Sequence, residues 1–386
     1  MSIYEAVLLL IMAIGAFVSP YLSKKIKLPI PVIEILFGIL VGSFIHIEQH
    51  AFSIIKFMSE FGFLILMYLA GLELDIEELK ETPKKEFFIY TAYYLIIIAL
   101  TLVSAFIFDI SVPLVLLASM TAIGLLFPIL SESGTLHTPT GKNLLVIGSV
   151  GEIISLITIT ATTIYYNYGI SLKALHHIAE IVFFCIFAFF FLKGLKLYSW
   201  WYPNTLLKIV SSENNAETGM RTNFLNMLMF VALAAFLNIE IIIGSFIGGM
   251  LYATVLKEKE DIREGFEMFG NGFLIPIFFI YVGLSFDISS LANTKVLLYS
   301  FALSSGILLT RMVASVIFIF ADIHLRSLIT IPIGTSFPLT LLVAFAEIGR
   351  STGILTNEMA NAAILTSIFT AIFYPSLFKV ALRFAK

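Results

Sequence analysis

The most informative stretch of this sequence is Ile123-Gly124-Leu125-Leu126-Phe127-Pro128, which recurs 210 residues later as Ile333-Gly334-Thr335-Ser336-Phe337-Pro338. Four of the six positions are identical. A longer match precedes it, because residues 65–79 and 277–291 share six of fifteen positions, including a Gly-Leu and an Asp-Ile pair. Two matches in the same order and at nearly the same spacing predict an internal repeat.

The composition around these motifs is that of a membrane protein. Hydrophobic residues make up 59% of the 386, charged residues only 13%, and the mean hydropathy is +1.00. A soluble domain of this length could not bury so much apolar surface, whereas a bilayer accepts it. Runs such as Phe87–Phe108 and Ile178–Phe191 are apolar on every face and lack the alternation of a barrel strand. We therefore expect an all-α polytopic protein embedded in the lipid bilayer.

About thirteen transmembrane helices are predicted, and the loop charges agree with that count. Assigning loops alternately to the two sides collects 18 Lys and Arg on one side and 4 on the other. By the positive-inside rule the N-terminus is outside and the C-terminus cytoplasmic. The predicted spans lie near 4–22, 30–46, 57–74, 86–108, 112–131, 142–166, 176–198, 221–238, 240–256, 266–284, 295–320, 325–347 and 355–380.

The repeat offset corresponds to seven helices, an odd number, so the second copy is predicted to lie inverted in the bilayer. Repeat one would cover about 1–166 and repeat two about 221–380, with a linking helix at about 176–198 and a polar break from Trp200 to Arg221. We expect residues 1–386 to form one transmembrane domain without a soluble regulatory domain. Inverted repeats are the architecture of many secondary transporters.

The repeated Gly-Pro motifs predict two broken helices. Gly124 and Pro128, and again Gly334 and Pro338, stand in the middle of hydrophobic spans, where they interrupt the helical hydrogen bonds. Either each proline only kinks its helix, or the two unwound stretches cross near the bilayer midplane and offer backbone groups to an ion. The match in register favours the second interpretation.

Three ionisable residues are placed inside predicted spans, namely Glu34, Glu152 and Arg311. A charge at mid-span costs about 2.5–3.5 kcal/mol on insertion scales. Because burying either charge alone would cost more, Glu152 and Arg311 are predicted to lie near one another. Glu347 falls closer to a helix end, where a structural role is expected.

Glu152 is the candidate ion ligand. It lies in a run of small residues that includes Ser149, Gly151 and Ser155, which would let another backbone approach. A carboxylate binds either a proton or a monovalent cation, and this competition is the minimum an antiporter needs. The alternative is a static bridge between Glu152 and Arg311. For Glu34, an accessory place on the ion path and a purely structural role are equally plausible.

Other functional classes lack support in the sequence. The single cysteine, Cys185, excludes an intrachain disulfide and a multi-cysteine metal site. We expect no cofactor and no bound metal other than a transported ion. No nucleophile–base set is evident, so an enzyme is not expected. The net charge of −3 is spread over the loops without a basic patch, so nucleic acid is not an expected partner.

Several segments together resemble the monovalent cation/proton antiporter-2 family. They are 31–42, 61–79, 244–251 and 276–284. The resemblance covers nearly the whole chain. It implies a dimerisation domain, a core domain with crossed broken helices that moves in an elevator-like manner, and a homodimer.

The resemblance also implies roles for single residues. The family's Asp-Asp or Asn-Asp pair falls on Gly151-Glu152, which places Glu152 at the essential ion-binding carboxylate. Arg311 falls where the family has a basic partner of the site, and Thr121 matches a cation-binding threonine of the unwound helix. The sequence departs from the family at Gly151 and at residues 338–340, where an acidic motif is replaced by Pro-Leu-Thr.

The sequence thus predicts a secondary transporter of the cell membrane that exchanges Na⁺ or K⁺ for H⁺. With a single titrating carboxylate opposite one arginine, the exchange is expected to be one-for-one and electroneutral. Two alternatives remain: a transporter of the same fold for another solute, and a non-transporting sensor or partner subunit with a fixed Glu152–Arg311 bridge.

Overall fold

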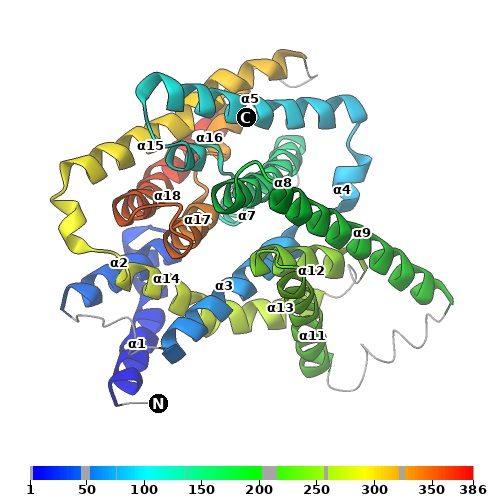
Figure 1. The fold of residues 1–386 in the computed structure, drawn as a ribbon, viewed down its shortest axis with the longest axis horizontal. Helices are drawn as coiled ribbons and strands as arrows, with labels where there is room; N and C mark the ends of the chain where they lie inside the picture. The colour runs from blue at the N-terminus through cyan, green and yellow to red at the C-terminus, as the bar shows by residue number, and fades with distance from the viewer. Residues whose placement is uncertain are drawn as a thin grey trace. The chain divides into compact units, whose positions relative to one another are not determined.

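The computed structural model describes residues 3–44, 53–74, 76–136, 138–201, 215–255, 260–320 and 327–385. These residues form helices joined by short turns, without a strand among them (Figure 1). The predicted polar break between Trp200 and Arg221 lies largely outside the described residues. The all-helical fold class predicted from the sequence is confirmed.

The described helices fall into two compact units, and each unit draws on both halves of the chain. The division falls within α1 (Ile3–Ile26), α4 (Ile76–Glu81) and α14 (Ile275–Leu284), and it also separates the last two residues of α8 (Pro139–Tyr168) from the rest of that helix. The first unit otherwise consists of α3 (Ser53–Glu73), α9 (Leu172–Trp201), α11 (Asn215–Phe236), α12 (Ile241–Val255), α13 (Glu260–Phe269) and the π-helix η2 (Gly270–Leu274).

Small residues allow the helices of the first unit to approach closely. A Cβ atom added to Gly71 or Gly249 would overlap the backbone of the facing helix, so α3 and α12 touch main chain to main chain. The Ser245 hydroxyl donates to the carbonyl oxygen of Leu64 at 2.5 Å across the same contact. Small residues in this arrangement are typical of packed transmembrane helices.

The second unit contains the two predicted broken helices. Its elements are α2 (Ile30–Phe44), α5 (Lys84–Phe108), α6 (Val112–Leu116), η1 (Leu117–Ser119), α7 (Leu126–Glu132), α8 (Pro139–Tyr168), η3 (Ile288–Leu291), α15 (Thr294–Ala314), η4 (Ser315–Phe320), α16 (Ser327–Gly334), α17 (Leu339–Ser351) and α18 (Asn357–Ala385). The order α5, α6–α7, α8 is repeated as α15, α16–α17, α18 at the spacing of the sequence repeat.

Both breaks occur where the repeated motifs predict them. In the first, residues 120–125 are not helical, and Pro128 lies in the first turn of α7, where a missing N–H is tolerated. In the second, α16 ends at Gly334, and Pro338 precedes α17. The chain bends by 42° at this second break.

Hydroxyl groups satisfy carbonyl oxygens that the breaks release. Ser119 donates to the carbonyl oxygen of Leu116 at 2.7 Å, and Ser336 donates to that of Pro332 at 2.5 Å. Non-helical backbone at membrane depth is tolerated only where such partners exist, so these bonds explain how both breaks are accommodated.

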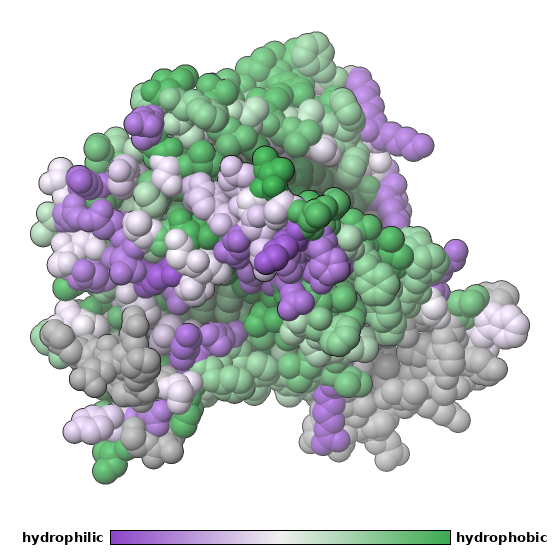
Figure 2. Space-filling model, viewed as in Figure 1, coloured by the Kyte–Doolittle hydropathy of each residue, from purple (hydrophilic) through white to green (hydrophobic). Residues whose placement is uncertain are grey.

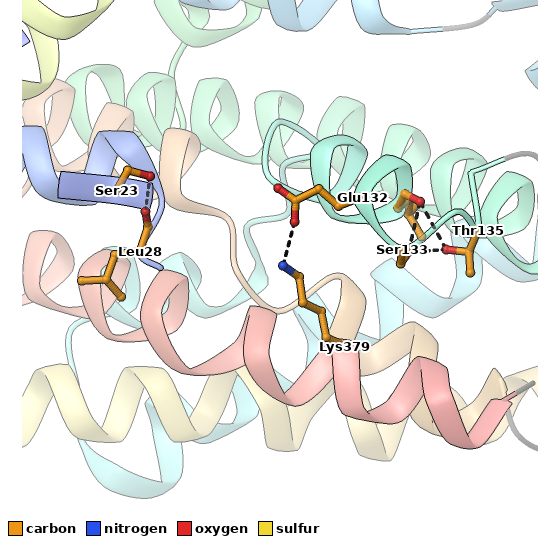
Figure 3. A network of polar contacts seen from close by, with 7 residues as sticks. Ser23, Leu28, Glu132, Ser133, Thr135 and Lys379 are labelled. Atoms are coloured by element: carbon orange, nitrogen blue, oxygen red, sulfur yellow. Dashed lines mark hydrogen bonds and ion pairs between the residues drawn. The ribbon is translucent and has the colours of Figure 1, made fainter. Parts of the chain in front are cut away.

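The two broken helices approach each other (Figure 1). A Cβ atom added to Gly124 would lie 3.8 Å from Cγ2 of Thr340, the second residue of α17. The repeats are also tied together at the end of α7, where Lys379 of α18 donates to Glu132 at 2.8 Å (Figure 3). The crossed arrangement predicted from the repeat is therefore present in the second unit.

Among the described residues, nine helices are long and apolar enough to cross a membrane, or ten if the bent pair α16–α17 forms one span. Two shorter apolar helices, Ile30–Phe44 and Ile241–Thr254, lie at two further predicted spans. Figure 2 shows broad areas of hydrophobic side chains, as expected of helices in contact with lipid, together with a band of hydrophilic side chains across the same face. The chain is a multi-pass membrane protein, and the count of thirteen spans stays a prediction.

Candidate cation site at the crossed helices

The Glu152 carboxyl group lies beside the first break. Glu152 is on α8 and is 1% exposed. Its Oε2 accepts a hydrogen bond from the backbone N–H of Ile123, in the unwound segment, at 3.4 Å. The small residues predicted to admit a neighbouring backbone do so, since Gly148 faces the Ile123 side chain without room for a Cβ atom.

One turn further along α8, Ser155 anchors the same segment. Its hydroxyl accepts the backbone N–H of Thr121 at 2.8 Å and donates to the carbonyl oxygen of Gly151 at 2.7 Å. Thr121 is fully buried. Ser155 and Glu152 therefore hold the unwound segment at two amides, those of Thr121 and Ile123.

Arg311 reaches this segment from α15. Its side chain is fully buried, and it donates hydrogen bonds to the oxygen atoms of four residues: the carbonyls of Ala118 (2.7 Å), Ile307 (2.9 Å) and Met120, and the Thr121 hydroxyl (3.1 Å). Met120 and Thr121 lie in the break and Ala118 lies in η1 just before it, so the guanidinium satisfies oxygen atoms where the helix is interrupted. A guanidinium suits this position because its donors form a fork and it keeps its charge.

The structure thus brings together four of the residues predicted from the sequence, namely Glu152, Thr121, Ser155 and Arg311. Glu152 and Arg311 both bind the same unwound segment. Glu152 binds it at Ile123, and Arg311 binds it at Met120 and Thr121. The direct contact between them stays a prediction.

The two accessory residues are placed differently. Ser149 is 5% exposed and lies on α8, three residues before Glu152. Glu34 is 2% exposed and lies on α2, which packs against η3, α18 and the backbone at Leu284.

Two tyrosines of α5 were missed by the sequence analysis. Tyr93 and Tyr94 are at most 1% exposed, and their ring centroids lie 5.0 Å apart. A Cβ atom added to Gly151 would overlap the ring and hydroxyl of Tyr94. The one available signal was Gly151 itself, since a glycine beside a buried carboxylate leaves space that another helix must fill.

The groups around the first break have the chemistry of a cation site. Carbonyl and hydroxyl oxygens at Ala118, Met120 and Thr121 attract a cation, while the Glu152 carboxylate supplies the negative charge. Hard monovalent cations are bound by oxygen ligands of this kind. Among the described residues no group of three His, Cys, Asp or Glu side chains could hold a metal ion. The arrangement resembles the cavity-facing broken helices of transporters.

Comparisons with known proteins agree with this arrangement. YjbQ of Bacillus subtilis, named provisionally as a Na⁺/H⁺ antiporter, is 26% identical over 394 residues, covering 96% of this chain and 62% of YjbQ. The chain thus spans somewhat less than two thirds of that relative. The Na⁺/H⁺ antiporter of Enterococcus hirae is 20% identical over 380 residues, covering 96% of both chains.

A solved structure has the same fold. The sodium proton antiporter MjNhaP1 from Methanocaldococcus jannaschii superposes with a TM-score of 0.70 over 98% of both chains, at 14% sequence identity. The family described as "Sodium/hydrogen exchanger, transmembrane" matches residues 12–383, nearly the entire sequence. This chain is a member of the sodium/hydrogen exchanger transmembrane family.

Proposed function

We propose that this chain exchanges one monovalent cation, Na⁺ or K⁺, for one proton, with Glu152 as the ligand that both ions share. The observation that carries the proposal is the position of Glu152, which is 1% exposed and bonded to the unwound segment at Ile123. Family membership makes the chain a transporter of the sodium/proton exchanger type. That membership gives no reason to assign an enzymatic reaction to the chain.

The exchange follows from charge. An ionised carboxylate in a low-dielectric site needs a positive partner, and either a proton or a cation can supply it. Binding one removes the reason to bind the other. Alternating access to the two sides of the membrane then couples the downhill movement of one ion to the uphill movement of the other.

Thr121 and backbone oxygens of the unwound segment complete the proposed site. In this structure Arg311 binds Thr121 and the carbonyl oxygens of Ala118 and Met120. These are the atoms that a cation would use, so Arg311 acts as a tethered cation that keeps them in place when no ion is bound. A bound ion would displace at least one of these hydrogen bonds, and Arg311 would form it again when the cation leaves.

The proposed exchange is electroneutral because only one group at this site titrates. Glu152 changes its charge by one, whereas a guanidinium keeps its charge throughout. One proton is therefore exchanged for one cation. Oxygen ligands bind both Na⁺ and K⁺, which is why both ions belong to the proposal.

The setting in the cell is also proposed. The distribution of Lys and Arg supports a place in the cell membrane with the N-terminus outside and the C-terminus cytoplasmic. The family resemblance supports a homodimer. Labelling of cysteines introduced near each terminus, from either side of the membrane, tests the orientation, and the molar mass in detergent tests the dimer.

Transport by purified protein tests the function. Proteoliposomes containing a pH-sensitive dye receive Na⁺, K⁺ or Li⁺, and wild type is compared with Glu152→Gln. Cation-driven proton flux that Glu152→Gln abolishes supports the proposal. A matched control is Glu60→Gln, because Glu60 is 60% exposed and only forms a surface ion pair with Lys56; this variant should transport like wild type.

Other outcomes point to the alternatives. Cation-driven proton flux that survives the Glu152→Gln substitution would show that Glu152 is not the ligand shared by the two ions. No flux with any cation would favour transport of another solute or a non-transporting subunit. A rate that changes with an imposed membrane potential would contradict electroneutral exchange.

A further inference from the structure

Tyr94 of α5 carries a buried hydroxyl group that the proposed mechanism does not yet use. The residue is 1% exposed, and its hydroxyl has no hydrogen bond that meets normal geometry among the described residues. A buried polar group without a partner is costly and rare, so each one needs an explanation. Tyr93 beside it and Nε of Arg311 are in the same situation.

The position of this hydroxyl is specific. It lies over Gly151, where a Cβ atom would overlap both the oxygen and the ring. The electrostatic neighbours of the phenol include Arg311, the Thr121 side chain and Glu152. The Tyr94 oxygen therefore occupies the space of a side chain at position 151 and faces the same three groups that form the cation site.

The helix geometry shows that this placement is not incidental packing. Tyr90, Tyr93 and Tyr94 are all buried on one side of α5, because residues three and four apart share a helix face. Tyr90 donates its hydroxyl to Glu86 at 3.1 Å and is satisfied. Only the two tyrosines beside Arg311 keep unbonded hydroxyls within this part of α5.

We infer that the Tyr94 hydroxyl is a ligand of the transported monovalent cation, supplied from α5 in the place left open by Gly151. The inference rests on the proposed function. The cation would be held by the Glu152 carboxylate, the Thr121 hydroxyl and the Tyr94 oxygen together, with a phenol lone pair facing the ion. Because the hydroxyl makes no hydrogen bond of normal geometry to the described residues, its lone pairs are available to the ion.

The substitution Tyr94→Phe tests this inference, since it removes one oxygen and keeps the ring that packs over Gly151. Loss of one neutral ligand should weaken the apparent affinity for Na⁺ by roughly tenfold. The maximal exchange rate at saturating Na⁺ should be retained. Affinity is measured twice, as the Na⁺ concentration giving half-maximal proton flux in proteoliposomes and by calorimetric titration of purified protein with NaCl.

The control is Tyr90→Phe on the same helix. Its hydroxyl is bonded to Glu86, away from the cation site, so the affinity for Na⁺ should equal that of wild type. A purely structural role for Tyr94 would lower the unfolding temperature of Tyr94→Phe and leave the affinity unchanged. That result would overturn the inference.

A reciprocal exchange gives a second test. Gly151→Asn alone should prevent Na⁺ binding, because the new side chain overlaps Tyr94. Combining it with Tyr94→Ala makes room and supplies an amide oxygen from the other helix, so binding should return at least in part. If the double variant binds no better than the Tyr94→Ala single variant, the two positions do not share one ligand place and the inference is wrong.

The two proposals fail differently. If wild type binds Na⁺ without exchanging it for protons, the proposed function fails, while calorimetry with Tyr94→Phe still decides the ligand. If wild type exchanges ions and Tyr94→Phe binds Na⁺ normally, only the ligand assignment fails. If wild type binds no monovalent cation, both fail.

Discussion

Replacing Arg311 by methionine should destabilise the protein, and added cation should restore part of the loss. Methionine fills most of the same volume, so the main effect is the loss of charged donors. The carbonyl oxygens of Ala118 and Met120 and the Thr121 hydroxyl lose their partner, whereas Ile307 keeps the helical N–H of residue 311. Removing one side of a buried charged interaction costs about 3–5 kcal/mol.

The dependence on cation follows from linkage. The oxygens that Arg311 vacates are those proposed for the transported ion. In the variant Na⁺ displaces no guanidinium, so it should bind the variant more tightly than wild type and stabilise it more. A ligand present at about 100 times its dissociation constant adds about 2.7 kcal/mol. The gap in unfolding temperature between wild type and Arg311→Met should therefore be wide in choline chloride and clearly narrower in NaCl.

Thermal unfolding in detergent, followed by circular dichroism, measures this gap in both salts. Arg350→Met is the control, because Arg350 also donates to two oxygens in partly buried contacts, at Ser285 (2.9 Å) and Asn361 (2.7 Å), but does so away from the first break. Its deficit should be the same in both salts. An Arg311→Met deficit that is equally independent of salt would refute the reasoning, as would a variant as stable as wild type.

Three further expectations concern single contacts. Ser155→Ala should cost about 1–3 kcal/mol in the free energy of unfolding, because the buried Thr121 N–H loses its acceptor; an unchanged denaturation midpoint would contradict this. Gly249→Val should prevent correct folding, since a side chain there overlaps the backbone of α3, and undiminished yield of folded protein on size exclusion would show the helices to be further apart. The two hydrogen bonds from Ser289 hold the pKa of Asp287 below its ordinary value. The contribution of the Asp287 carboxylate to stability is therefore present at neutral pH and is lost as the pH falls below about 4. The unfolding temperatures of wild type and Asp287→Asn should then converge at acid pH.

Much of the fold could be predicted because the forces that specify it are local. Hydropathy alone places a span, and each predicted span overlaps a helix or a helix pair of the described residues. The breaks were predictable because Gly and Pro weaken a helix and the repeat marked the two places that matter, whereas Pro20 and Pro375 lie inside continuous helices. The π-helix at Gly270–Leu274 and the short helix Ile76–Glu81 were missed, since neither has a distinct sequence signal.

The site was predictable only as a list of participants. A buried Glu152 and a buried Arg311 are expensive in a membrane and therefore draw attention in the sequence. The structure adds which atoms they bind. The described hydrogen bonds of Arg311 reach oxygens at and just before the first break, 190 to 193 residues away in the chain, while its proximity to Glu152 stays a prediction.

The amino-acid sequence alone thus determined the membrane class, the repeat, the two interrupted helices and the presence of a carboxylate within a hydrophobic span, because each depends on hydropathy or on backbone chemistry within a few residues. Only the tertiary structure decided that Tyr94 covers Gly151 and that Arg311 donates hydrogen bonds to carbonyl oxygens at the first break. These contacts join helices distant in sequence, and their energies depend on the approach of particular atoms, which no local pattern encodes.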